Sequence, residues 1–387
     1  AAHFPVGVLM SKKLSSQKLL KNNVLDAKLC TGCGACVNIC PYQTIYNDRT
    51  VQLHYCDLTD GKCYAYCPRT PADLSRLREL FFDAKDLTPE IGAVKTYYLT
   101  RAADPEIRAV AQHGGTVTAL MELALVEGWI DAALVSSDEQ YLRHGTAASD
   151  KSMLRKNAGA KFIVSPMAAA FNQFVRQENA NAGVVATPCQ ALALAKMKLN
   201  RDKEEAPKIN HLQFVIGLYC GWVLSAEKFS ALLAEKSVKR EEIKRMDIPA
   251  GKNILELYTR RGVKEIPFNE AQVCIREACN YCTDSTAEYA DVSVGAARFA
   301  GTVDEQRGWN QLIVRTQKGR ELVDLAVKRG VLEIKEAPVK SLRQLKVAAM
   351  DKKKNALKNI VRKSGSAKNL LYLDSRDAMV RKILKAG

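Results

Sequence analysis

The sequence predicts an α/β core, a mixed sheet covered by helices, preceded by a small cysteine-rich α+β module. Seven of the twelve cysteines lie between residues 30 and 67, and strand-like apolar segments alternate with helical ones after about residue 95. The 387 residues are enough for two or three domains. We expect an N-terminal extension (1–25), the cysteine-rich module (26–75), the core (95–335) and a basic helical tail (336–387).

The elements follow in order along the chain. The first 25 residues read as a polar lead-in, and "NNVLDAKLC" and "RTVQLHYC" are expected to be short hairpin strands of the module. Residues 76–95 read as a helix that ends at Pro89, followed by a linker. The predicted core elements are strand 94–102, helix 114–128, strand 129–137, helix 165–177, strand 182–190 running into a turn, helix 191–199 and strand 211–220. The last strand is apolar almost throughout, as expected when both faces of a sheet are buried.

Net charge and hydropathy restrict the partners. The formal net charge is +16, and residues 340–387 hold fourteen Lys and Arg against three Asp, a net +11. Such a tail suits nucleic acid, an anionic membrane or an acidic protein, and a solvated helix explains it equally well. Aromatic residues are too sparse there for base stacking, so we expect no nucleic-acid partner. With no secretory signal and no apolar run of about 18 residues, we expect a cytoplasmic protein without a transmembrane span.

The first cysteine motif predicts an iron–sulfur cluster. A disulfide framework belongs to small secreted domains, whereas clustered cysteines in an intracellular protein usually bind metal. "CTGCGACVNICP" has the spacing Cys30-x2-Cys33-x2-Cys36-x3-Cys40-Pro, which is the run of bacterial ferredoxins. A zinc site would instead have two pairs of cysteines separated by a long spacer.

The second cysteine motif completes a two-cluster ferredoxin-like module. The fourth cysteine of each run ligates the other cluster, so Cys67 of Cys63-x3-Cys67-Pro68 should return to the first. Asp60 stands where a regular run has its middle cysteine, and its carboxylate can ligate iron as a harder ligand than thiolate. Alternatively, Asp60 only caps a turn, and the second cluster has three irons or is missing. We expect one cluster at Cys30, Cys33, Cys36 and Cys67 and another at Cys40, Cys56, Asp60 and Cys63.

A third cysteine group follows in the core. Cys274-x4-Cys279-x2-Cys282 supplies three thiols and needs a fourth, for which Cys189 and Cys220 remain. Both follow apolar strands, where a buried thiol would also be ordinary. We favour Cys189, because it lies in a predicted turn, and a third [4Fe-4S] cluster, with zinc as the competing metal.

A glycine pair indicates a binding site for phosphate. Gly114, Gly115 and Thr116 begin a helix, whose free amides and dipole favour an anion such as pyrophosphate, although glycine there often makes only a turn. Lys161 is a second candidate, for a phosphate or an isoalloxazine carbonyl. His113 either donates a proton near a flavin or helps to cap the helix.

Over about residues 95–330, the chain resembles the coenzyme F420 hydrogenase/dehydrogenase beta-subunit family. The resemblance is carried by "QHGGTVTALMELALVEGWIDAALV", "AKFIVSP", "GVVATPCQ", "IGLYC" and "CNYCTDSTAEYADVSVG". The resemblance implies a core that binds FAD and a [4Fe-4S] cluster and exchanges hydride with the deazaflavin F420. Two departures weaken F420 as the assigned substrate. Gln112 and His113 precede the glycine pair where the family has a Ser-Ser/Gly-Gly start, and Asp60 replaces a cysteine.

These inferences predict a flavin iron–sulfur oxidoreductase subunit with FAD and three [4Fe-4S] clusters. A flavin connects two-electron hydride chemistry to one-electron clusters. The expected partners are a soluble F420-like hydride carrier and another redox subunit, such as a hydrogenase or formate dehydrogenase. The alternatives are a ferredoxin-fed reductase of an organic substrate and a non-catalytic electron-relay subunit. The residues expected around FAD are Gly114, Gly115, Thr116, Lys161, Thr187 and Pro188.

Overall fold

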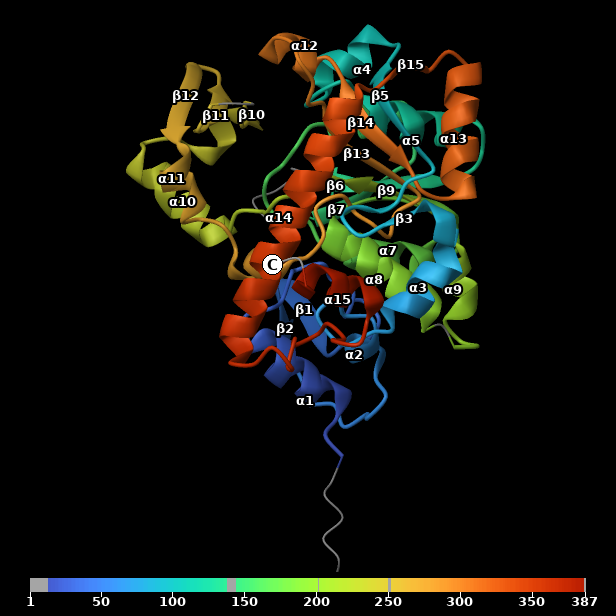
Figure 1. Cartoon of the computed structure of the whole chain (residues 1–387), viewed down its shortest axis with the longest axis vertical. Coiled ribbons are helices and arrows are strands. Elements are labelled where there is room, and N and C mark those ends of the chain that lie inside the picture. The colour runs from blue at the N-terminus through green and yellow to red at the C-terminus, as the bar shows by residue number, and fades with distance from the viewer. Residues whose placement is uncertain (1–12, 138–143, 201, 250–251, 386–387) are drawn as a thin grey trace, which may run out of the picture.

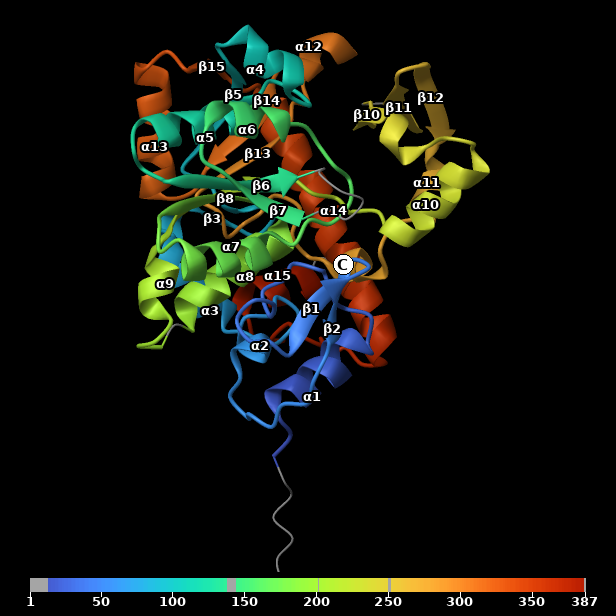
Figure 2. The same ribbon diagram turned by 180° about the vertical axis from the view of Figure 1, so that it is seen from behind.

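The computed structural model describes residues 13–137, 144–200, 202–249 and 252–385. Its centre is an eight-stranded sheet with the strand order β15-β5-β14-β13-β9-β8-β6-β7. The cysteine-rich module lies at one end of the molecule, and a three-stranded unit stands to one side (Figures 1 and 2). The predicted mixed sheet with helices, preceded by a cysteine-rich module, is confirmed.

Four adjacent strands of the sheet are parallel. Strand β13 pairs in parallel with β9, β9 with β8, and β8 with β6, while the strands at both edges are antiparallel. The sheet consists of β5 (Thr96–Ala102), β6 (Ala132–Ser137), β7 (His144–Ala148), β8 (Ala182–Ala186), β9 (Leu212–Leu218), β13 (Val292–Ala296), β14 (Asn310–Val314) and β15 (Leu332–Glu336). Most residues of the middle strands are buried, which explains why they read as continuous apolar runs.

Helices pack against the two faces of this sheet as two hydrophobic clusters. Helices α5 (Thr116–Val126) and α13 (Gln317–Lys328) contribute to one, and α7 (Met167–Gln177) and α8 (Pro188–Leu199) to the other. The shorter helices are α4 (Pro105–Val110), α6 (Lys151–Lys156), α9 (Ala206–Asn210) and α12 (Val303–Arg307). The turn expected within residues 187–190 is the first turn of α8, because Thr187 and Gln190 form a capping box and Pro188 occupies the first turn.

A unit that the sequence did not indicate, which we call the side lobe (residues 225–275), stands beside the main sheet (Figure 1). Its antiparallel sheet contains β10 (Ile243–Asp247), β11 (Ile254–Thr259) and β12 (Gly262–Pro267). Its helical segments are α10 (Ala226–Glu235), η3 (Arg240–Glu242) and α11 (Phe268–Gln272). The lobe has an apolar core of its own, and Cys274 belongs to it.

The structure differs from two expectations in and just after the cysteine-rich module. "NNVL" is helical, because α1 (Ser16–Leu20) continues as η1 (Lys21–Leu25), and their apolar side chains pack with the module's cysteines. Its strands are β1 (Gln43–Tyr46) and β2 (Arg49–Gln52), and a short helix, α2 (Lys62–Ala65), follows. The helix expected to reach Pro89 is α3 (Leu74–Phe81), and the chain continues through η2 (Ala84–Asp86), β3 (Leu87–Thr88) and β4 (Gly92–Ala93). The expected extension is described only from residue 13.

The basic tail is helical and packed on the rest of the chain. Helix α14 (Val339–Ser364) runs from the main sheet to the cysteine-rich module, where α15 (Ala378–Lys385) lies beside it (Figures 1 and 2). Ala349, Ala356 and Ile360 form part of its buried face. Among the described residues, no helix combines the length and apolar character needed to cross a membrane.

Candidate functional site

A cavity of about 520 Å³ lies where the four parallel strands end. Ser136 of β6, Val185 of β8, Leu218 of β9 and Val294 of β13 all line it near the carboxyl ends of their strands. In open α/β sheets this is the edge at which ligands bind. The size falls within the range of about 300–1,000 Å³ for sites that hold small molecules and cofactors.

One wall of the cavity is the beginning of α5. Gly115 has φ 80°, in the left-handed region, and directs the chain into the helix. An added Cβ on Gly114 would lie 3.0 Å from Arg101 Cβ, Asn310 Oδ1 and the Thr100 carbonyl oxygen, so a side chain at this position would crowd its neighbours. The Thr116 amide donates to Asn310 Oδ1 (3.2 Å), and the following residues of the first turn face the cavity.

The segment before α7 and the beginning of α8 also line the cavity. Lys161 lies in the first, and its Nζ donates to the Ala158 carbonyl oxygen at 3.3 Å. Thr187 and Pro188 belong to the second. Of the six residues expected around FAD, Gly115, Thr116, Lys161, Thr187 and Pro188 line this one cavity, and Gly114 directly precedes it.

His113 also lines the cavity. Its Nδ1 is buried and has no hydrogen-bond partner among the described residues. Burial lowers the pKa of His113 to about 4, because desolvation disfavours the imidazolium, although Asp247 opposes this shift. The ring is therefore neutral near pH 7.

The four cysteines expected at the first cluster lie near one another. Burial raises the pKa of the Cys36 thiol most, and charge repulsion from Cys33, Cys30 and Cys67 raises it further. Four thiols that repel one another in a buried space are a suitable donor set for a cationic cluster, which binds thiolates and removes the repulsion.

The second group contains three of the expected ligands. Burial raises the pKa of Cys63 to about 11, and repulsion from Cys40 and Cys56 contributes in the same direction. Asp60 is exposed, and no hydrogen bond joins it to these thiols in the part of the chain that the structure describes. Gln43 was not among the expected residues. It is buried, and a hydrogen bond from its side chain lowers the pKa of Cys63, whereas its Oε1 has no hydrogen-bond partner among the described residues.

The third group differs from the expected one. Burial raises the pKa of Cys220 most, and repulsion from Cys279, Cys189 and Cys282 raises it further. These four cysteines all line the large cavity. Both candidates for the fourth position, Cys189 and Cys220, therefore join the group.

Cys274, which the expected ligand set included, lies apart from this group in the structure. Its side chain is 2% exposed within the apolar core of the side lobe, together with residues such as Leu224 and Phe229. Its carbonyl oxygen accepts from the Ser225 amide, which fixes it at the base of the lobe. The chain leaves the lobe before reaching Cys279, so nearness in sequence does not bring the two thiols together.

No group of three His, Cys, Asp or Glu side chains in the described residues has the geometry to hold a single metal ion. Grouped thiols are the usual donor set of iron–sulfur clusters.

Buried cations surround the first and third groups. Lys196 is 1% exposed, and its Nζ donates to the carbonyl oxygens of Cys67 (2.6 Å) and Thr70 (3.0 Å). Burial lowers the pKa of Lys196 to about 8. Arg69 is buried between the two groups, where negative charge on Cys282 and Cys189 raises the pKa of its guanidinium group. Buried cations of this kind offset the negative charge that thiolate-bound clusters carry.

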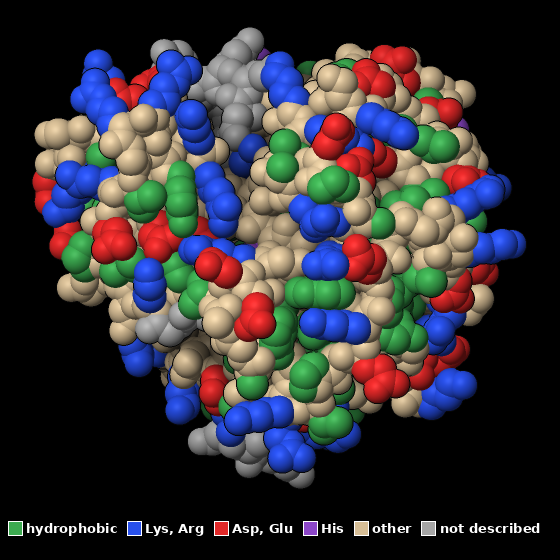
Figure 3. Space-filling model, turned by 90° about the horizontal axis from the view of Figure 1, so that it is seen from above, with side chains coloured by type: hydrophobic (Ala, Val, Ile, Leu, Met, Phe, Trp, Pro, Cys, Tyr) green, Lys and Arg blue, Asp and Glu red, His purple; other side chains and the backbone are tan. Residues whose placement is uncertain are grey.

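The mouth of the site is a hollow between the side lobe and the main body, with Lys and Arg side chains around it (Figure 3). A cavity of about 280 Å³ there shares His113 and Gln112 with the large one. Four guanidinium groups line it, and they belong to Arg101, Arg108, Arg245 and Arg307. Arg108 donates to the carbonyl oxygens of Ala102 and Ala103, whereas Arg101 pairs with Glu333.

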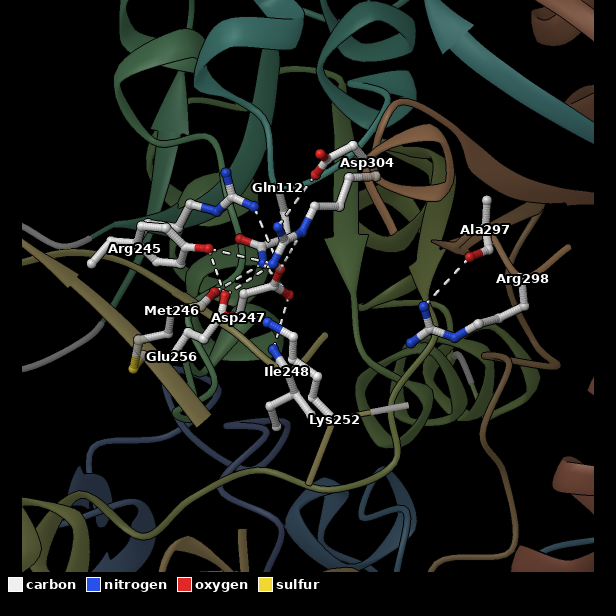
Figure 4. A network of polar contacts seen from close by, with 12 residues as sticks. Gln112, Arg245, Met246, Asp247, Ile248, Lys252, Glu256, Ala297, Arg298 and Asp304 are labelled. Carbon is white, nitrogen blue, oxygen red and sulfur yellow. Dashed lines mark hydrogen bonds and ion pairs between the residues drawn. The ribbon is translucent and has the colours of Figure 1, made fainter. Parts of the chain in front are cut away.

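Asp247 joins the side lobe to this mouth (Figure 4). Its carboxylate is 4% exposed and accepts from Gln112 Nε2 at 3.0 Å and from Arg307 at 2.8 Å. Arg307 also pairs with Glu256 of β11 at 2.9 Å. Gln112 therefore ties the segment before α5 to the lobe, a role that the sequence did not reveal.

Three family models match the chain. Residues 97–172 match the N-terminal model of the family "Coenzyme F420 hydrogenase/dehydrogenase, beta subunit", and residues 180–340 match the C-terminal model of the same family. Residues 24–46 match "4Fe-4S binding domain". The matches cover the core and the first cysteine motif. The side lobe lies inside the second match, and α14 extends beyond its end.

Individual proteins are similar over most of the chain. The beta subunit of the coenzyme F420 hydrogenase of Methanothermobacter thermautotrophicus is 31% identical over 283 residues, 70% of this chain and 95% of that protein. A subunit of the F(420)H(2) dehydrogenase of Methanosarcina mazei is 25% identical, and the match covers 86% of this chain and 92% of that protein. The coenzyme F420-dependent sulfite reductase of Methanocaldococcus jannaschii is 28% identical over 86% of this chain, which spans about half (51%) of that longer protein.

A solved structure has the same fold. A chain of the F420-reducing [NiFe] hydrogenase complex from Methanosarcina barkeri superposes with a TM-score of 0.64 and 26% sequence identity. The similarity covers 71% of this chain and 94% of that one.

Proposed function

The chain belongs to the coenzyme F420 hydrogenase/dehydrogenase beta-subunit family, and we propose that it passes electrons between an F420-like hydride carrier and a redox partner, using FAD and three iron–sulfur clusters. The family and the 4Fe-4S domain make it an electron-transfer oxidoreductase subunit. The flavin, the carrier and the cluster count are the proposed part.

One observation carries the proposal. The large cavity at the strand ends has Gly115 and Thr116 on one wall and four cysteines, Cys189, Cys220, Cys279 and Cys282, on another. A cofactor in this space would meet a helix beginning that suits phosphate and thiols that suit a cluster. FAD, when bound, supplies the exchange between a hydride and single electrons.

The chain's own residues have separable roles around that cavity. The Thr116 amide already donates to Asn310, so the next amides of the first turn of α5 would bind phosphate oxygens, and Lys161 adds a positive charge in the cavity lining. His113, neutral near pH 7, holds a proton on one ring nitrogen and offers the other as an acceptor. The arginines at the mouth favour an anionic carrier over a neutral one.

The cysteine groups suggest a route outwards. Negative charge on Cys189 of the third group raises the pKa of Cys33 in the first group, so these two groups are neighbours. Cys67 of the first group and Cys63 of the second are one helical turn apart in sequence. We therefore propose the order third, first, second. Cys40 and Cys56 of the second group are partly exposed, which suits exchange with a partner protein.

The names of the relatives suggest the kind of partner. They include subunits of an F420 hydrogenase, an F420-dependent formate dehydrogenase and an F420H2 dehydrogenase. In the proposal, this chain is the F420-facing subunit of such a complex.

Composition and reduction of the anaerobically purified chain test the proposal. We expect one flavin, and twelve irons for three four-iron clusters or about eleven if the second cluster has three irons. Reduced F420 should bleach the flavin absorbance. Fewer than seven irons or stoichiometric zinc would refute the three-cluster assignment. Bleaching only by reduced ferredoxin would favour a reductase of an organic substrate, and absence of flavin would favour a simple relay.

A further inference from the structure

Lys352 of the basic tail reaches the third cysteine group. From α14, its Nζ donates to the Cys220 carbonyl oxygen at 2.7 Å and to the Asp284 carbonyl oxygen at 2.8 Å. The same side chain lines the large cavity. Two well-directed hydrogen bonds therefore fix a positive charge in the wall that the four thiols share.

Cys282 lies beside the same charge. Its Sγ is 3.3 Å from the Asp284 carbonyl oxygen, which also accepts from Lys352 Nζ at 2.8 Å. The other acceptor of Lys352 is the backbone carbonyl oxygen of Cys220. The ammonium group is thus held next to two members of the group, which belong to different segments of the chain.

Lys352 lies outside the part of the chain that defines the family. The family model ends at residue 340, whereas α14 continues to Ser364 (Figure 1). The tail's charge first suggested nucleic acid, a membrane, an acidic protein or simple solvation. Lys352 has none of these roles, because it is directed into the core. Its neighbour Lys353 is also directed inwards, and it pairs with Glu288.

We propose that Lys352 is a positioning residue that raises the reduction potential of the third iron–sulfur cluster. The inference rests on the proposed function, because it requires a cluster at Cys189, Cys220, Cys279 and Cys282. Reduction adds one negative charge to a cluster, and a fixed cation nearby stabilises the reduced form more than the oxidised form. The cation lies in a cavity wall, where salt screens it less than at the surface.

A role in holding the flavin is the competing explanation, since Lys352 borders the same cavity. An ammonium group has three donors, and two of them are already used on carbonyl oxygens that belong to the cysteine group. Both acceptors lie next to or within two residues of a proposed cluster ligand. The geometry therefore assigns the charge to the cluster.

The test compares the full chain with Lys352→Met, Lys352→Arg and, as a matched control, Lys358→Met. Lys358 is an exposed lysine of the same helix. An anaerobic redox titration monitored by EPR gives the midpoint potential of each cluster, and flavin content and flavin potential are measured in parallel. We expect Lys352→Met to lower the potential of the third cluster only, while Lys352→Arg and Lys358→Met stay close to wild type.

Each other outcome has a meaning. Unchanged cluster potentials in Lys352→Met, or a change confined to flavin content or potential, would overturn the inference. If Lys352→Met loses the third cluster on purification, Lys352→Gln, which can still donate to both carbonyls, takes its place. A wild-type potential in that variant would also overturn it. A wild-type chain without a third cluster refutes the proposed function and this inference together, whereas an intact cluster with an unshifted potential refutes only this inference.

Discussion

Asp60 is the residue at which the second cysteine run departs from the ferredoxin pattern. Its side chain is exposed, and the neighbouring Gly61 amide donates to Ser16 Oγ, which anchors this loop on α1. The carboxylate is therefore free to turn towards Cys63 or to remain in solvent. The donor atom decides the character of the second cluster, because a carboxylate is harder and binds iron less strongly than a thiolate.

We predict that Asp60→Cys retains the second cluster and changes its reduction potential and EPR spectrum, since a thiolate replaces an oxygen ligand or an open position. Asp57→Cys is the matched control, because Asp57 is an exposed aspartate three residues away. It should leave the spectrum unchanged. If Asp60→Cys also leaves spectrum and potential unchanged, Asp60 does not belong to the second cluster.

His113 has a pKa that makes stability depend on pH. Burial lowers the pKa from 6.5 to about 4, so the unfolded chain takes up a proton below pH 6.5 while the folded chain does not. Stability from this residue is therefore complete above pH 6.5 and is lost as the pH falls towards 4. At pH 5.5 the loss is about 1 kcal/mol.

The corresponding measurement is the thermal midpoint of anaerobic protein at pH 7.5 and pH 5.5. We expect wild type to lose more stability over this interval than His113→Asn, which cannot titrate there. His211 is the control: its ring bonds to Asn181 and Asn179, and His211→Asn should keep the wild-type difference. Equal losses in wild type and His113→Asn would show that His113 does not remain neutral.

At the scale of elements, α5 has a left-handed glycine at each end. Gly115 (φ 80°) precedes the helix at the cavity, and Gly128 (φ 68°) follows it at the surface. An added Cβ at Gly115 would lie 2.9 Å from Ile107 Cγ2 and 3.3 Å from Ala102 Cβ, whereas at Gly128 nothing lies within 4 Å. Alanine would incur the same backbone cost at both positions, but only at Gly115 would it be crowded by neighbouring side chains.

Gly128→Ala should therefore cost about 1–2 kcal/mol of stability, from the left-handed conformation alone. Gly115→Ala should cost about 1–3 kcal/mol more, because the helix beginning must shift to make room. We expect this shift to lower the flavin content of Gly115→Ala, while Gly128→Ala retains its flavin. Thermal midpoints and flavin absorbance after anaerobic desalting measure both effects. Equal flavin contents in the two variants would show that the beginning of α5 does not take part in flavin binding.

At the scale of the whole molecule, the cysteine-rich module is joined to the core too closely to act as a separate domain. An added Cβ at Gly34 would lie 2.5 Å from Ala169 Cβ of α7. Asn172 Nδ2 donates to the Val37 carbonyl oxygen at 2.8 Å, and Arg276 donates to the Thr31 carbonyl oxygen at 2.6 Å. Deleting residues 1–75 would expose this interface, so single ligands are the better test of the electron route.

We predict that Cys56→Ser removes or converts only the second cluster. The cavity and the other two cysteine groups are built from other residues, so flavin and reduction of a small artificial dye by the hydride donor should be retained. Transfer to the protein partner should fail, because the outermost cluster is damaged. Iron content, EPR and the two activity assays measure this.

Cys274→Ala is the matched control for that variant. It replaces a cysteine that packs in the side lobe, so it should keep the full iron content of wild type. Loss of about four irons in Cys274→Ala would restore Cys274 as a ligand. Partner transfer that survives in Cys56→Ser would mean that electrons leave from the third group instead.

Features that depend on short stretches of chain could be predicted from the sequence. The spacing of Cys30, Cys33 and Cys36 and the return of Cys67 could be predicted, because a few residues between ligands leave few ways to wrap a cluster. The order of the main strands and helices was also predictable, since each carries its own apolar period. The glycines at the beginning of α5 indicated a binding site in the sequence because a tight turn is a local feature.

Only the tertiary structure decided what depends on segments that are distant in sequence. Cys189 and Cys220 both join Cys279 and Cys282 because β8 and β9 are neighbours in the sheet and end at the same edge. Cys274 lies apart from them because the side lobe buries it, although it is only five residues from Cys279. Lys352 reaches the same wall because α14 crosses it, and a count of tail charges cannot show where a helix packs. Spacing restricts ligands within one loop, whereas strand order and helix packing bring separate segments together.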